Sequence, residues 1–372
     1  MSDLTATSRE AFRDLLATLQ EVADRYAGEE WALFTPDDVA EGLRVILHHV
    51  ATGIETQLEE DAAAPTFRSI VTPWRKALGD NADAMYHDAK IDPAGTYRIS
   101  GRTAGAVYVS FTVEAGAEDG AFPSGTVGVL NDTGFDVDGD GGFAITLGGP
   151  KQDRNWLGLA EGASRITVRH YWEQASPPAI PPAPELALKI ELVGGNVAPS
   201  PRAPNDESVA RSIRRMARYV RSRTVDLIAK PGAGEAPAFV SRIPNLFVAP
   251  VKPGAHALAA ADAAYSLAPY VLGPDEALVI SGRWPKCRCA NVNLWNRQLQ
   301  TYDYLRHRVS LNRAQMKLEA DGSFRVVIAH RDPGMPNWLD TEGRTFGLVF
   351  WRFMLPDGEI ETPHAEVIEL GL

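Results

Sequence analysis

The segment Ile99-Ser100-Gly101-Arg102 ends an apolar run, and it recurs 181 residues later as Ile280-Ser281-Gly282-Arg283. Two further segments recur in the same order at nearly the same offset: Asp140-Gly141-Gly142-Phe143 as Asp321-Gly322-Ser323-Phe324, and Asn155-Trp156-Leu157 as Asn337-Trp338-Leu339. Three matches in the same order at nearly the same offset indicate an internal duplication. We therefore expect two copies of one structural unit.

Each unit has the pattern of antiparallel β-structure. The Asp-Gly pairs precede alternating apolar runs at 143–147 and 324–328, and Asp-Gly before a strand is typical of a tight hairpin turn. No strand is followed by a helix in the rhythm of a parallel α/β fold. The sequence thus predicts a mainly β protein with two repeated, jelly-roll-like β-sandwich halves.

Three segments show the apolar spacing of amphipathic helices. They run from about residue 8 to 26, onward from Thr35-Pro36, and from about 207 to 228. Thr7 and Glu10 have capping-box spacing, and Thr35-Pro36 is a favourable helix start. We divide the chain into an N-terminal helical segment (1–90), a first β-sandwich half (91–200), a linker with a basic helix (201–245) and a second half (246–372).

Composition narrows the classes of function. The chain has 372 residues and a net charge of -11, which disfavours nucleic acid as a partner because the phosphate backbone is also negative. No apolar run is long enough to span a membrane, and the N-terminus lacks the pattern of a signal peptide. The two cysteines, Cys287 and Cys289, are too close in sequence for a relaxed disulfide. We expect a cytoplasmic protein.

A family resemblance rests on segments of both halves. They are 294–301, Tyr304, 309–313, 321–323, 329–334 and 337–340, with 79–86 and 97–101 further back. The most specific elements are Asp332-Pro333-Gly334 and Asn337-Trp338-Leu339. With these segments the chain resembles the bacterial family called domain of unknown function 1214. The resemblance implies a jelly-roll-like sandwich and no particular activity.

The stretch 291–313 is dense in polar and aromatic residues, as the wall of a ligand pocket is. Strand alternation places Asn293, Trp295 and Arg297 on one face, with Leu294 and Asn296 on the other. From this stretch we predict a set of substrate-binding residues: Asn296, Trp295, Arg308 and Asn312.

The catalytic prediction centres on the loop 329–334, which contains a histidine, an arginine and a carboxylate. His330, Asp332 and Tyr304 have no evident counterparts in the first half. Histidine titrates near neutral pH and suits general acid–base chemistry. In this hypothesis His330 exchanges a proton with the substrate, Asp332 or a neighbouring backbone group fixes its tautomer, and Tyr304 binds the substrate oxygen.

Two other motifs favour structural roles. Asp136, Asp138 and Asp140 imitate the start of a calcium loop, but Leu147 occupies the position of the final carboxylate ligand, so we interpret them as an acidic turn. Six arginines between residues 211 and 223 crowd the third helix. They could form a surface for anions, but in so acidic a chain we favour a solvated face packed against an acidic body.

Two hypotheses for function remain. The first is a cofactor-independent acid/base enzyme of lyase, hydratase or isomerase type, acting on a small aromatic or apolar molecule in bacterial catabolism. The second is a non-catalytic sandwich that binds a carbohydrate or small ligand through Trp295, Trp338 or Trp351. Neither hypothesis requires a cofactor, a metal, nucleic acid or a membrane partner, and either is compatible with a homo-oligomer.

Overall fold

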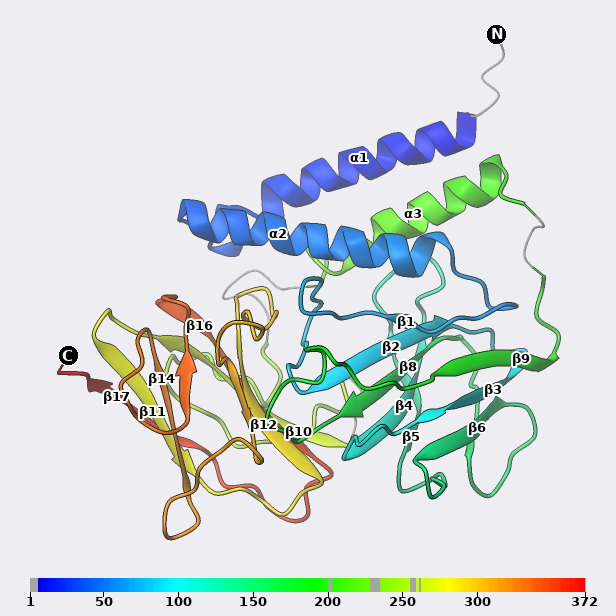
Figure 1. Ribbon diagram of the computed structural model, residues 1–372. Coiled ribbons are helices and arrows are strands. Elements are labelled where there is room, and N and C mark those ends of the chain that lie inside the picture. The colour runs from blue at the N-terminus through cyan, green and yellow to red at the C-terminus, as the bar shows by residue number, and fades with distance from the viewer. Residues whose placement is uncertain (1–5, 200–202, 228–234, 255–258, 261, 372) are drawn as a thin grey trace.

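The computed structural model describes residues 6–199, 203–227, 235–254, 259–260 and 262–371. These residues form two β-sandwich halves side by side, with the helices gathered along one edge of both (Figure 1). The prediction of a mainly β chain with an N-terminal helical segment and a helix between two β halves is confirmed.

Each half contains two sheets. In the first half the inner sheet has the order β1-β2-β8-β4-β5: β1 Arg68–Ser69, β2 Ala84–Lys90, β8 Ala163–Tyr171, β4 Tyr108–Ala115 and β5 Gly125–Asn131. Its outer sheet has the order β7-β6-β3-β9: β7 Trp156–Leu157, β6 Gly142–Gly148, β3 Gly95–Arg102 and β9 Lys189–Gly195. The strand β2 precedes residue 91, so the first half takes in the end of the segment expected to be helical.

The second half repeats this topology. Its inner sheet has the order β10-β16-β12-β13: β10 Ala263–Val271, β16 Phe346–Met354, β12 Cys289–Trp295 and β13 Ser310–Asn312. Its outer sheet has the order β15-β14-β11-β17: β15 Trp338–Asp340, β14 Phe324–Ala329, β11 Glu276–Gly282 and β17 His364–Glu369. In both halves the short edge strand, β7 or β15, pairs in parallel with its neighbour.

Equivalent residues make equivalent contacts, which confirms the duplication. Trp156 donates its indole N–H to a backbone carbonyl of the adjacent β6 end at 2.9 Å, and Trp338 does the same at the end of β14 at 3.1 Å. Asn155 and Asn337 both have positive φ, 55° and 58°. The repeated asparagine and tryptophan are therefore elements of the fold that set where the parallel edge strand begins.

The two inner sheets pack against each other, so the molecule has four sheet layers (Figure 1). Every residue of β4, β8 and β12 is buried, since each strand has one face toward its own sandwich and one toward the other half. Aromatic side chains of both halves share this contact: Tyr86, Tyr108 and Tyr171 from the first, Tyr265 and Phe350 from the second.

The helices follow the sequence pattern except at the start of the first helix and at the end of the third, which ends at Ser222 and not near residue 228. Helix α2 (Pro36–Gly53) begins as predicted, because Thr35 accepts a hydrogen bond from Asp38 N at 3.1 Å and proline takes the first helical position. Helix α1 (Ala6–Tyr26) starts before the predicted capping box. Its first N–H groups instead donate to Asp206, the first residue of α3 (Asp206–Ser222), with Ser8 N at 3.0 Å. The short helices are η1 Glu29–Trp31 and η2 Ile54–Leu58.

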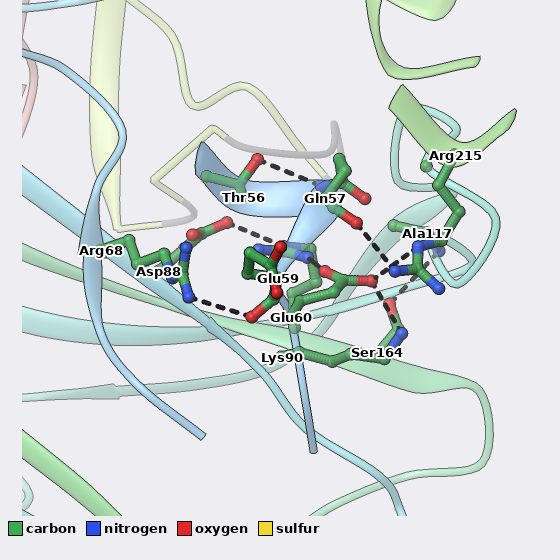
Figure 2. Close-up of polar contacts among 12 residues, drawn as sticks. Thr56, Gln57, Glu59, Glu60, Arg68, Asp88, Lys90, Ala117, Ser164 and Arg215 are labelled. Carbon is green, nitrogen blue, oxygen red and sulfur yellow. Dashed lines mark hydrogen bonds and ion pairs between the residues drawn. The ribbon is translucent and has the colours of Figure 1, made fainter. Parts of the chain in front are cut away.

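A buried ion network fastens the helices to the first half (Figure 2). The Glu60 side chain, just after η2, is only 4% exposed and contacts Lys90 at 2.8 Å, Arg165 at 2.6 Å and Arg215 at 3.2 Å. Arg165 also pairs with Asp88 at 2.7 Å. One carboxylate thus joins β2, β8 and α3. Because these charges already neutralise one another, we interpret the network as a structural clamp.

The ion network generates a stability prediction. Glu60→Gln should destabilise the protein by about 3 kcal/mol, because it leaves buried cations without their carboxylate. Urea unfolding followed by circular dichroism measures the effect. In the matched control Asp136→Asn, an exposed carboxylate loses its pairing with Arg154 and stability should change little. Equal stability of Glu60→Gln and the parent would contradict the role of the clamp.

The repeated Asp-Gly turns generate a second prediction. Gly141 and Gly322 have φ of 85° and 83°, as the sequence predicted, and a β-branched residue resists this conformation. Gly322→Val should cost about 1 kcal/mol or more of unfolding free energy. Gly139→Val is the control, because a side chain there meets nothing within 4 Å and no positive φ is required. Identical melting temperatures for the two variants would refute the strain argument.

Candidate functional site

The segment Gly79–Asp83 leads into β2 and docks on the second half. Trp295 donates its indole N–H to the Asp80 carbonyl at 2.9 Å, and the N–H of Thr301 donates to the Asp80 carboxylate at 2.7 Å. The N–H of Ala82 donates to the side chain of Asn293 at 3.2 Å. Residues that carry the family resemblance in each half therefore bind each other where the halves meet.

Asp83 is the buried carboxylate at the end of this segment. One of its oxygens accepts from the Asn291 amide at 2.7 Å and the other from the Asn312 amide at 2.8 Å. Burial raises the pKa of Asp83 to about 6, although both asparagine amides favour the charged form. A carboxyl with this pKa can hold or release a proton near neutral pH.

Arg352 of β16 lies beside Asp83 and is also buried. Its Nη2 donates to the Gly79 carbonyl at 3.3 Å, whereas Nε and Nη1 have no hydrogen-bond partner among the described residues. The amide nitrogens of Asn81 and Asn293 also lack an acceptor in that part of the chain. Buried donors are nearly always paired, so this group has the capacity to bind oxygen atoms of water or a ligand.

A small cleft joins these residues at the contact between the halves. Asp83, Tyr171, Cys289, Asn291 and Arg352 are among its lining residues, and it has room for about one water molecule. Burial raises the pKa of Cys289 well above its usual value, which disfavours a reactive thiolate. Glu173 also lines the cleft, but its carboxylate is held by Arg313 at 2.7 Å. The chemically versatile group in the cleft is therefore the Asp83 carboxyl, with the Arg352 guanidinium beside it.

The structure brings two of the four predicted binding residues to this site. Asn312 binds Asp83 directly, and Trp295 lies in the inter-half contact, stacked on Phe350 at 4.2 Å between ring centroids. Asn296 lies in the turn after β12, where its side chain accepts from the N–H groups of Gln298 and Gln300. Arg308 is exposed. The last two are thus a turn residue and a surface residue.

The predicted catalytic residues are not gathered into one site. Thr341, not Asp332, holds the His330 ring, with 2.6 Å between Nδ1 and the hydroxyl oxygen. Asp332 is exposed and accepts from Gly334 N at 2.8 Å, as in an ordinary turn. Tyr304 is buried in the core of the second half, 4.7 Å from its ring centroid to Lys76 Nζ, and burial raises its pKa. No hydrogen bond or ring contact joins the three residues within the described chain.

Sequence reasoning missed Asp83, Asn291 and Arg352 as site residues. Asp83 was noted only within the resembling segment 79–86. A signal was present in the inner strands, since a strand that is buried on both faces but contains Asn291, Asn293 or Arg352 must give those polar groups partners. These polar residues can be recognised as site candidates only when the structure shows that both faces of β12 and β16 are buried.

Among the described residues, no group of three or more His, Cys, Asp or Glu side chains lies close enough together to hold a metal ion. No helix in the described part combines the length and apolar character that crossing a bilayer requires.

Comparisons with known proteins find a family model and solved structures of similar fold. Residues 291–357 match the family model "Protein of unknown function (DUF1214)". The crystal structure of an uncharacterized protein from Burkholderia cenocepacia is 25% identical, covers 97% of both chains and superposes with a TM-score of 0.82. The VPA0106 protein from Vibrio parahaemolyticus is 12% identical, with 96% of this chain and 100% of that chain covered and a TM-score of 0.51. A search of curated proteins found no match. The matched residues, 291–357, include Asn291, Asn312 and Arg352 of the candidate site.

Proposed function

We propose that this protein is a cofactor-independent acid/base enzyme that adds or removes water from a small organic molecule with an aromatic or apolar body. In this proposal Asp83 exchanges the proton. The observation that carries it is the buried Asp83 carboxyl, whose pKa is raised to about 6 in a cleft with room for about one water. A general base next to a held water molecule is the arrangement that hydration chemistry requires.

The neighbouring groups support a role in binding an oxygen-bearing substrate. Arg352 has two guanidinium nitrogens without a partner among the described residues, and these can hold a substrate oxygen as charge builds on it. Both cysteines are free, which supports the proposal that the enzyme works in a reducing compartment such as the cytoplasm.

In the alternative, binding without catalysis, two of the three tryptophans predicted to contact a sugar are buried. Trp295 is buried against Phe350, and Trp351 is fully buried in the core of the second half, so neither can stack on a sugar in this conformation. Trp338 is half-buried, and its indole N–H is used by the fold.

The raised pKa of Asp83 predicts a pH dependence of stability. Between pH 4 and 6 the unfolded chain has lost this proton while the folded chain keeps it, so the contribution of Asp83 to stability falls as pH rises through this window. Relative to Asp83→Asn, the parent should gain up to about 3 kcal/mol when pH is lowered from 7 to 4. Urea titrations at each pH measure this difference. A difference that does not vary with pH would show that the carboxyl titrates normally.

The catalytic role is tested once a substrate has been found. The assay is a screen of hydroxylated and unsaturated aromatic or apolar compounds, in which the loss or gain of water by each compound is measured. Asp83→Asn should lower kcat by about 10²–10⁴-fold, and parental kcat/KM should rise with pH through about 6 because the base must be ionised.

Two further variants make this test specific. Asp132→Asn is the matched control, because burial also raises the pKa of Asp132 but the residue lies outside the cleft, and its activity should match the parent. His330→Gln tests the histidine hypothesis. If His330→Gln lost activity while Asp83→Asn kept it, the reaction would belong to the loop 329–334 and not to the cleft.

A further inference from the structure

A groove of about 800 Å³ lies between α1, α3 and the loop that carries Asp119. This volume is within the range of small-molecule sites. Five arginines of α3 line it: Arg211, Arg214, Arg215, Arg218 and Arg221. The basic helix is therefore not simply a solvated face, because one row of its arginines faces a hollow.

The five arginines divide into two groups by their partners. Arg215 is held by Glu60 at 3.2 Å, and Arg221 pairs with Glu21 and, at 3.2 Å, with Asp226. These two are occupied by the fold and fasten α3 to its neighbours.

The other three arginines are exposed, and none of them has a close ion pair with a described residue. Arg214 lies 3.7 Å from Glu10, and Arg218 lies 3.5 Å from Asp119, in pairs that solvent reaches freely. Arg211 has no ion pair with any described residue. Exposed pairs contribute little stability, so a stronger anion can displace these carboxylates at small cost.

The spacing of the exposed arginines fits a ligand with more than one anionic group. Positions 211, 214 and 218 lie on one face of α3 and span about 10 Å along its axis. Each guanidinium offers paired donors that match phosphate oxygens, and a phosphoryl group carries more charge than a carboxylate. The hydroxyls of Thr7 and Thr18 add polar groups from α1.

The loop that carries Asp119 packs closely against α3 at Gly120. Gly120 has φ of 86°, and a Cβ there would lie 2.1 Å from the Arg215 carbonyl, so no other residue allows so close an approach. Arg223 also donates to the Gly120 carbonyl at 3.2 Å. The loop that carries Asp119 is thus fixed by backbone contacts, and the groove does not depend on a ligand for its shape.

We propose that this groove binds a small molecule bearing two or more phosphoryl groups, with Arg211, Arg214 and Arg218 as its contacts. The site is separate from the inter-half cleft, and the proposal does not depend on the reaction proposed above. The carboxylates at its rim, Glu118, Asp119 and Glu207, compete with the ligand and favour anions of high charge.

The test is calorimetric titration of the full chain with inorganic tripolyphosphate at fixed ionic strength. Binding should be saturable with one site per chain. Arg211→Gln and Arg218→Gln should each weaken it by about tenfold or more, and Arg211→Lys should weaken it less. Asp119→Asn should tighten it, because Arg218 loses its competing carboxylate.

Matched controls separate a site from general electrostatics. Arg283→Gln removes an exposed arginine of the second half that pairs with Asp321. Asp275→Asn removes the carboxylate that pairs with the exposed Arg331, as Asp119→Asn does for Arg218. Neither should change binding. The proposal is overturned by non-saturable binding, by equal weakening in Arg283→Gln, or by citrate binding as tightly as tripolyphosphate. The exposed variants should melt at the parental temperature, which confirms that each is folded.

Discussion

The packing of the two inner sheets against each other is the constraint on which the rest of the structure depends. The strands β4, β8 and β12 of these sheets have no face in water, so the polar side chains that they carry need partners inside the molecule. Arg165 finds Glu60 and Asp88, while Asn291 finds Asp83. The clamp beneath the helices and the candidate site between the halves are two solutions to the same problem.

The two solutions differ in which groups surround the buried carboxylate. Around Glu60, cations and carboxylates alternate at close distance, as expected for a structural network. Around Asp83, two amides hold the carboxyl, but Arg352 keeps donors without protein acceptors. Incomplete satisfaction of buried groups costs stability, and a fold that retains it has a place for water or a ligand. In the clamp, Asp88 Oδ1 also lacks a hydrogen-bond partner among the described residues, so what distinguishes the cleft is its charged and amide lining around room for about one water molecule.

Duplication explains why the fold was predictable and why the site was not. The repeated residues, such as Asn155 with Asn337 and Trp156 with Trp338, shape turns and edge strands within each copy. The contact between copies follows the repeat as well, since Asn312 donates to Asp83 at 2.8 Å and, at the equivalent place, Asn131 donates to Asp262 at 2.7 Å. Arg169 and Arg352 also occupy equivalent positions, on β8 and β16. Unrepeated polar residues therefore point away from this contact: His330 has a hydroxyl partner, and Asp332 lies in an exposed turn.

The sequence by itself determined the features that depend on neighbouring residues: the Asp-Gly turns with positive φ, the Thr35-Pro36 helix start, the strand alternation and the duplicated order of elements. Only the tertiary structure decided which polar residues meet. Asp83 and Asn312 are 229 positions apart, and Glu60 and Arg165 are 105 apart. It also decided that α1 is capped by Asp206 and which arginines of α3 face the groove. Local patterns reflect backbone preferences over a few residues, whereas burial and charge pairing depend on how distant segments pack, and that packing leaves no short-range trace in the chain.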